Sequence, residues 1–179
     1  MNQEVVTIDQ LRDIFYSGYP ATTSWDLIDQ LYIAIHTDEI VYSKSVLCSV
    51  EHYHTLIDKA KQSEGLGPQS KGHMALKDVA QQFILNHLGQ SAYLEYYFAG
   101  LHPDALSYDY NYVIECGTTD PSCVIIYLTQ PDVKWIGNIP YPVEEESEIM
   151  LHSFSRGVRF TEMIQQNVSR LRDAFLKRR

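Results

Sequence analysis

Apolar residues recur at helical spacing through the first 60 residues. Residues 7–10 (Thr-Ile-Asp-Gln) have the form of a capping box, and the apolar positions that follow predict a short helix ending at Gly18. Ser24 can cap a second helix, and residues 46–60 predict a third. We therefore expect residues 1–65 to form a helical N-terminal extension.

Strand-like patterns begin only after a break in the chain. Residues 64–70 contain two glycines and a proline, which cannot continue a helix, so we expect a boundary there and a second part over residues 66–179. Beyond it, apolar spacing predicts a helix over 71–88 that ends at Gly89, and the aromatic-rich residues 92–98 predict a strand. The second part thus combines helix and strand.

Two carboxylates flank a predicted hairpin. Polar residues 108–111 predict a turn, with arms over 105–108 and 112–116. Asp104 enters the first arm and Glu115 lies near the end of the second. Carboxylates on neighbouring strands can share a hard divalent cation such as Mg²⁺.

The rest of the chain predicts further regular structure. Pro121 is placed to begin a helix, and residues 133–136 predict a strand. Residues 149–175 predict a C-terminal helix with a break near Gly157. Over residues 71–138 the predicted elements can be read in the order helix, three strands, helix, strand, which is an α/β arrangement.

The hairpin sequence resembles a nuclease signature. Pro103-Asp104, a short apolar strand and Glu115-Cys116-Gly117 resemble the motif of the PD-(D/E)XK nuclease superfamily, with Gly117 at the usual lysine position. The resemblance implies a restriction-endonuclease-like core, formed by a helix, a three-stranded antiparallel meander, a helix and a strand. It also implies that Asp104 and Glu115 hold Mg²⁺ or Mn²⁺, with the carbonyl of Cys116 completing the site.

Gly117 leaves this site without its lysine. Side chains alternate along a strand, so a lysine at position 117 would stand beside Glu115, where it could orient water and offset negative charge. Lys77 on the preceding helix and Lys134 on the following strand are the candidate replacements. We prefer Lys77, because the superfamily's first helix flanks its catalytic face; the alternative is that Lys77 is a solvated helix residue.

Other polar residues near the hairpin each have two interpretations. Glu95 is either a third metal ligand or an edge glutamate paired with a surface cation. Residues 118–121 either seat an anion at a helix N-terminus or cap that helix. Asp104 can instead bond local backbone N–H groups, and Cys116 is either a nucleophile or an inert core residue.

Charge is distributed unevenly along the chain. The net charge of −9 disfavours general nucleic-acid binding, because phosphate contacts need Lys and Arg. From His152 onward, however, the sequence has seven basic residues and only two acidic ones. These cations could grip a DNA backbone or complement a helix dipole. They are Arg156, Arg159, Arg170, Arg172, Lys177, Arg178 and Arg179.

The functional expectation has two classes. The first is a Mg²⁺-dependent nuclease, or a protein derived from one, that acts on DNA through its basic C-terminal segment. The second is a catalytically inactive binding module on the same fold, which Gly117 and the net charge favour. Three scattered cysteines without CxxC spacing, an acidic N-terminus and no apolar run of about 18 residues lead us to expect a cytoplasmic protein without a membrane segment.

Overall fold

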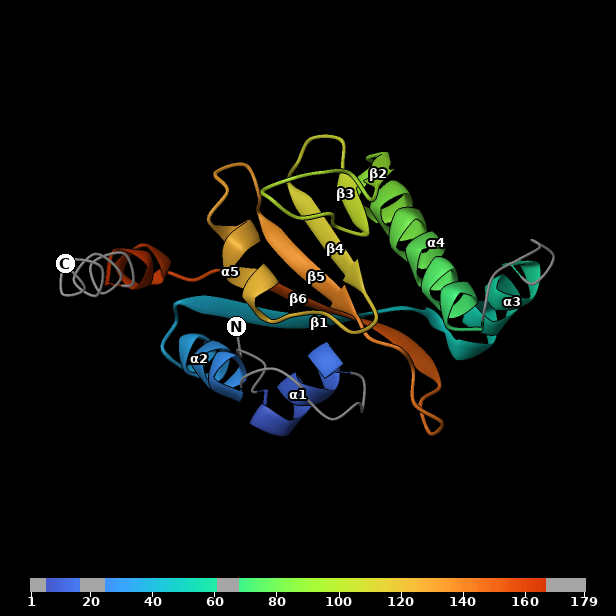
Figure 1. Ribbon diagram of the computed structural model, residues 1–179, viewed down its shortest axis with the longest axis horizontal. Coiled ribbons are helices and arrows are strands. Elements are labelled where there is room, and N and C mark those ends of the chain that lie inside the picture. Colours follow the sequence, from blue (N-terminus) through green and yellow to red (C-terminus); the bar gives the residue numbers. More distant parts are fainter. Residues whose placement is uncertain (1–5, 17–24, 61–67, 167–179) are drawn as a thin grey trace, which may run out of the picture.

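The computed structural model describes residues 6–16, 25–60 and 68–166, and its centre is a six-stranded mixed sheet with helices on both faces (Figure 1). The strands are β1 (Ile40–Ser49), β2 (Ala92–Leu94), β3 (Ala105–Ser107), β4 (Tyr112–Cys116), β5 (Trp135–Ile139) and β6 (Glu148–Arg156). The helices are α1 (Ile8–Tyr16), α2 (Trp25–His36), α3 (Val50–Ala60), α4 (Pro68–Leu88) and α5 (Ser122–Leu128), and residues 160–166 are also helical. None of the helices within these described ranges is long and apolar enough to cross a bilayer.

The sheet has the order β1-β6-β5-β4-β3-β2. Strands β4 and β5 are parallel, and every other neighbouring pair is antiparallel. Helix α4 is followed by the β2-β3-β4 meander, then by α5 as the crossover to β5. The α/β class predicted from the sequence is therefore confirmed.

The hairpin predicted from its turn residues is present. Ala105 pairs with Ile114, and the turn between β3 and β4 is fastened by Asp109. Its Oδ1 accepts hydrogen bonds from Ser107 Oγ at 2.6 Å and from the backbone N–H of Asn111 at 3.1 Å. An aspartate that bonds its own turn in this way fixes the register of both arms.

Two segments predicted to be helical are strands instead. The prediction that residues 1–65 are wholly helical is wrong at residues 40–49, which form β1. The prediction of a helix over residues 149–175 is wrong at residues 149–156, which belong to β6. These two strands pair with each other along their length. Strand β1 alternates in burial at its start, where Ile40 and Tyr42 are buried while Val41 is exposed. Both segments are strands because they pair with a partner about 110 positions away in the chain, and this pairing overrides their local helical pattern.

Other boundaries differ by shorter amounts. Strand β2 ends at Leu94 rather than at residue 98, because Glu95 has a left-handed backbone with φ of 50°. Helix α4 begins at Pro68, inside the predicted loop, as proline is tolerated in a first turn. The predicted capping box of α1 is confirmed by reciprocal bonds, Thr7 N to Gln10 Oε1 at 2.9 Å and Gln10 N to Thr7 Oγ1 at 3.2 Å. The predicted cap at Ser24 lies outside the described residues, as do the loop residues 64–67 and the C-terminal basic residues 170–179.

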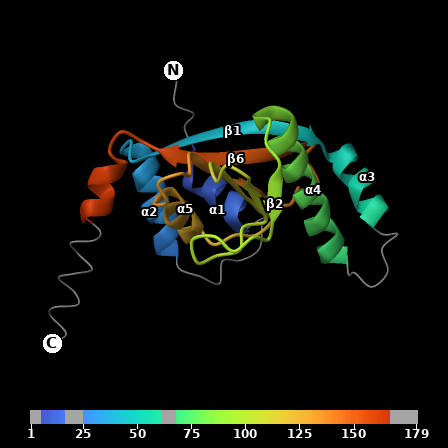
Figure 2. The ribbon, with the colours of Figure 1, turned by 90° about the horizontal axis from the view of Figure 1, so that it is seen from above.

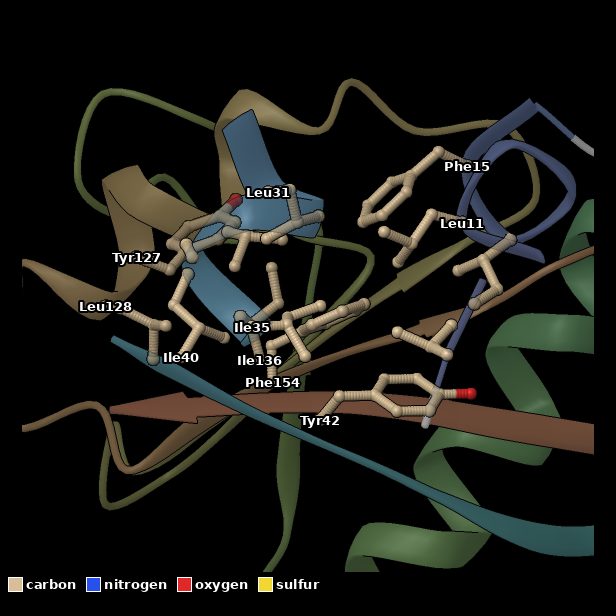
Figure 3. Packing of buried hydrophobic residues seen from close by; sticks show 14 of the residues in the cluster. Leu11, Phe15, Leu31, Ile35, Ile40, Tyr42, Tyr127, Leu128, Ile136 and Phe154 are labelled. Carbon is tan, nitrogen blue, oxygen red and sulfur yellow. The ribbon is translucent and has the colours of Figure 1, made fainter. Parts of the chain in front are cut away.

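One apolar core lies on each face of the sheet. Val113 packs in the first core and its neighbour Ile114 in the second, because successive strand residues point to opposite faces. The first core is covered by α1, α2 and α5, and the second by α3 and α4. Figure 2 shows β1 and β6 side by side across the molecule. Figure 3 shows the first core, with Leu11, Phe15, Leu31, Ile35, Tyr127, Leu128 and Phe154 among its members.

Candidate functional site

Asp104 and Glu115 lie on neighbouring strands at the end of the β3-β4 hairpin where β3 begins and β4 ends. Ala105 pairs with Ile114, so continuing the antiparallel register by one residue sets Asp104 opposite Glu115. Asp104 Oδ2 also accepts the backbone N–H of Cys116 at 2.7 Å. The two predicted carboxylates are therefore neighbours, and the start of one arm is fastened to the end of the other.

Helix α4 directs two nitrogen-bearing side chains at Asp104. His73 and Lys77 are four residues apart and therefore share one face of the helix. His73 Nε2 lies 2.9 Å from Asp104 Oδ1, and Lys77 Nζ lies 3.2 Å from the same oxygen. Lys77 also donates a hydrogen bond to Glu95 Oε1. Lys77 therefore bridges Glu95, just after β2, and Asp104, just before β3.

This network keeps Asp104 and Lys77 ionised. Burial opposes the charge of Asp104, but the hydrogen bonds from His73 and from the backbone of Cys116 outweigh it and hold the pKa of Asp104 below its usual value. Burial likewise opposes the charge of Lys77, but its bonds to Glu95 and Asp104 raise the pKa of that ammonium. The site thus holds a fixed negative and a fixed positive charge, each with less than 15 per cent of its side chain exposed.

Glu115 has a different environment from Asp104. Burial, followed by repulsion from Asp104, raises the pKa of Glu115 to about 7. Tyr127 of α5 donates its hydroxyl proton to Glu115 Oε1 at 2.9 Å, which partly opposes that rise. Two carboxyl groups on adjacent strands therefore differ in charge state near neutral pH, a pattern found at many sites of acid–base or metal chemistry.

Position 117 is closed to a side chain. Gly117 has φ of +77°, and a Cβ there would lie 2.5 Å from Cε2 of Tyr141. The Tyr141 hydroxyl in turn lies 3.4 Å from His73 Nδ1. Tyr141 thus occupies the place that a side chain at position 117, the lysine of the motif, would take, and it contacts the histidine that bonds Asp104.

Lys77 and Lys134, the two candidate replacements, lie in different surroundings. Lys77 contacts Asp104, whereas Lys134 Nζ lies 5.7 Å from the centre of the Tyr112 ring, at the opposite end of β4 from Cys116. The alternative reading of Lys77 as a solvated residue is wrong, since its side chain is 11 per cent exposed.

Glu95 lies just outside β2, and its side chain is 67 per cent exposed and bonded to Lys77. Cys116 is buried in the second core, and burial raises the pKa of its thiol well above the ordinary value, as the inert interpretation expects. Residues 118–121 make internal bonds: Thr119 Oγ1 donates to Asn138 Oδ1 at 2.9 Å, and Asp120 Oδ1 accepts the N–H of Ser122 at 2.9 Å.

Of the basic C-terminal residues, two lie in the part of the chain that the structure describes. Arg156 donates from Nε to the carbonyl of Leu128 at 2.8 Å and from its guanidinium to that of Gln130. It thereby satisfies carbonyls at the C-terminus of α5. Arg159 Nε lies 3.3 Å from Glu162 Oε2.

Sequence reasoning missed three members of the site: His73, Tyr127 and Tyr141. The spacing of His73 and Lys77 did carry a signal, because residues four apart on a predicted helix share a face. Tyr127 and Tyr141 had none, since Tyr127 reaches Glu115 only through the packing of α5, and Tyr141 reaches His73 only through that of the segment after β5.

The donor set suits a hard cation with few protein ligands. Asp104 and Glu115 offer carboxylate oxygens from adjacent strands, and Mg²⁺ commonly takes one or two carboxylates and completes its shell with water and substrate phosphate. Within the described ranges, no group of three or more His, Cys, Asp or Glu side chains is placed to hold a metal. A cation bound here would therefore have Asp104 and Glu115 as its protein ligands.

No protein-family model, no curated protein and no solved structure matches this chain. The chemistry of the site is therefore inferred from its own residues.

Proposed function

We propose that this protein is a Mg²⁺- or Mn²⁺-dependent nuclease, or a protein derived from one, that acts on DNA, and that its core is restriction-endonuclease-like. The observation that carries the proposal is the contact of 3.2 Å between Lys77 Nζ and Asp104 Oδ1. It supplies a cation from α4 to a carboxylate pair that lacks one at position 117.

The topology also supports the proposal. Helix α4, the antiparallel β2-β3-β4 meander, the α5 crossover and β5 parallel to β4 follow the order that the resemblance implies. Asp104 lies just before β3 and Glu115 near the end of β4, in the order of the motif.

Each residue has a distinct role in the proposal. Asp104 and Glu115 would hold the divalent ion, which would neutralise phosphate charge and activate water when bound. Lys77 stays protonated and would offset the negative charge that develops on the phosphate. His73 and the backbone N–H of Cys116 hold the Asp104 carboxylate in place.

A catalytically inactive binding module is the second candidate. Two observations favour it: Lys77 is already bonded to Glu95 and Asp104, and the net charge is −9. In this case the network would only stabilise the fold, and DNA would not be cleaved.

A cleavage assay separates the two candidates. Supercoiled DNA, linear DNA and RNA are incubated with the purified protein in Mg²⁺ or Mn²⁺, beside Asp104→Asn, Glu115→Gln and Lys77→Met. We expect each variant to lose about 100-fold or more in rate, while Lys134→Met, a lysine away from Asp104, keeps the parental rate.

Circular dichroism of each variant controls for folding. An Asp104→Asn/Glu115→Gln double variant that cleaves at the parental rate would remove this site from the mechanism. A parent protein that cleaves none of the substrates in either metal supports the inactive module.

A further inference from the structure

Exposed aromatic rings gather at the β2 edge of the sheet. In the described part of the chain, the exposed large aromatic side chains are Tyr96, Tyr97 and Tyr108, which are 42, 65 and 50 per cent exposed. All three lie between β2 and the turn that follows β3. We call these residues, together with Tyr93 of β2, the tyrosine platform.

Three of the four rings of the platform stack on one another. The Tyr93 ring centre lies 4.7 Å from that of Tyr96 and 4.2 Å from that of Tyr108, with interplanar angles of 28° and 25°. Tyr97 lies beside them in the chain, its ring centre 5.2 Å from that of His102. Stacked rings with exposed members are chemically suited to extend the stack with a further flat π-system.

The backbone holds these rings in fixed positions. Asp109 fastens the turn that carries Tyr108, and residues 98–101 form a tight turn closed by two bonds of 2.9 Å between Phe98 and Leu101. Left-handed φ values of 50° at Glu95 and 61° at Tyr110 fall in the same region. A pre-arranged surface loses little conformational entropy when a ligand binds.

Two chains of contacts join the platform to the candidate site. Glu95, next to Tyr96, is bonded to Lys77, which contacts Asp104. On the other side, the Tyr110 ring centre lies 6.1 Å from that of Tyr93 and 5.6 Å from that of Phe98. The Phe98 ring is in turn stacked at 6.2 Å on Tyr127, the residue that bonds Glu115. Each carboxylate of the site is therefore connected to the platform through a short series of side chains.

We propose that the tyrosine platform binds the unpaired bases of single-stranded nucleic acid and leads the strand to Asp104 and Glu115. This inference rests on the proposed function and narrows its substrate. Tyrosine rings stack on any base, whereas a duplex shields the faces of its bases and shows mainly phosphate. A chain with a net charge of −9 is poorly suited to hold duplex phosphate, but stacking needs little positive charge.

Fluorescence anisotropy with a labelled single strand of about 12 nucleotides, and with its duplex, tests the platform; Ca²⁺ replaces Mg²⁺ to prevent cleavage. We expect the single strand to bind at least tenfold more tightly than the duplex. Tyr96→Leu and Tyr108→Leu should each raise Kd about tenfold, whereas Tyr96→Phe and Tyr108→Phe, which keep the ring, should stay within about threefold of the parent. Tyr32→Leu, on α2, is the control for the same substitution elsewhere.

The dependence on salt gives a second measure. Binding dominated by stacking should show a slope of log K against log salt of only about −1 to −2. Equal affinity for duplex and single strand, or an unchanged Kd in both leucine variants, would overturn the inference.

Cleavage measured in parallel with Mg²⁺ keeps this inference separate from the proposed function. Tyrosine-dependent binding without cleavage of any substrate would sink the nuclease proposal and leave the platform standing. Cleavage that is lost in Glu115→Gln but unchanged in Tyr96→Leu and Tyr108→Leu would overturn the platform inference and leave the nuclease proposal standing.

Discussion

Tyr141 covers Gly117, so that a Cβ at position 117 would meet three atoms of the tyrosine side chain at 2.5 to 2.9 Å. The backbone at Gly117 is also left-handed, with φ of +77°. Both features disfavour a lysine at this position in the present fold. The ammonium group beside Asp104 comes from α4 instead, where Lys77 approaches the carboxylate.

Gly117→Ala tests how tightly Tyr141 closes this position. We expect the substitution to lower the free energy of unfolding by about 2–4 kcal/mol, because it adds a steric clash to an unfavourable backbone conformation. Gly89→Ala is the matched control: Gly89 has φ of +64°, but a Cβ there would meet no atom within 4 Å. Gly89→Ala should lower the free energy of unfolding by only about 1 kcal/mol.

Urea unfolding followed by circular dichroism measures both variants. Equal losses in Gly117→Ala and Gly89→Ala would contradict the clash with Tyr141. Shortening the tyrosine in a Gly117→Ala/Tyr141→Ala double variant should return the added loss at position 117 towards that of Gly89→Ala.

Lys77→Met tests the buried ion pair. Asp104 would remain buried and charged with one fewer cation, so we expect a loss of about 2–3 kcal/mol in the free energy of unfolding at pH 7. Lys59→Met, at an exposed position on α3, should change stability by less than about 0.5 kcal/mol. Urea midpoints give both values.

A double-mutant cycle with Asp104→Asn completes this test. If Lys77 stabilises the fold through Asp104, the loss caused by Lys77→Met should be smaller when residue 104 is asparagine. Strict additivity of the two substitutions would show that the contact of 3.2 Å carries no energy.

Local sequence features predicted the centre of the fold well. The turn residues around Asp109 and the apolar run before Glu115 predicted both arms of the hairpin, and these arms alone set Asp104 opposite Glu115. The preference for Lys77 came from the resemblance, and its contact with Asp104 agrees with the expected position on the preceding helix.

Long-range pairing explains what local patterns did not predict. Ile149 and Leu151 are buried on a strand whose partner, β1, is far away in the sequence, so neither strand is evident without the other. The pKa of Glu115 depends in the same way on its fold: burial and Asp104 raise it, and Tyr127 of α5 opposes them. The local sequence could predict the position of the Glu115 carboxylate on its strand but not the pKa of that group.

Cys116 should be unreactive in the folded protein. Its thiol is buried in the second core, and burial raises its pKa, so little thiolate forms and reagents cannot reach it. Cys48 and Cys123 are partly exposed. Iodoacetamide labelling followed by peptide mass spectrometry should modify these two first, and Cys116 only in urea. Labelling of Cys116 in native protein ahead of both would support the nucleophile interpretation instead.

Glu115 should make stability fall as pH rises towards neutrality. Burial and repulsion from Asp104 raise its pKa in the folded protein from 4.5 to about 7, so the folded state binds more protons than the unfolded chain between these values. The protonated group is fully compatible with folding below about pH 4.5. As pH rises through about 7 the fold must accept a buried charge, at a cost of up to about 3 kcal/mol.

The comparison that isolates this effect is the parent against Glu115→Gln, unfolded in urea at several values between pH 4.5 and 8.5. We expect the stability of the variant relative to the parent to increase with pH across this window and to level off above it, because glutamine cannot ionise.

Tyr127→Phe removes a hydrogen bond that lowers the pKa of Glu115, so it should move the midpoint of that increase to higher pH. If Glu115 also binds a divalent ion, Mg²⁺ should stabilise the parent more at pH 8 than at pH 5, since the ion favours the ionised carboxylate. A pH-independent difference between the parent and Glu115→Gln would show that Glu115 titrates normally in the folded protein.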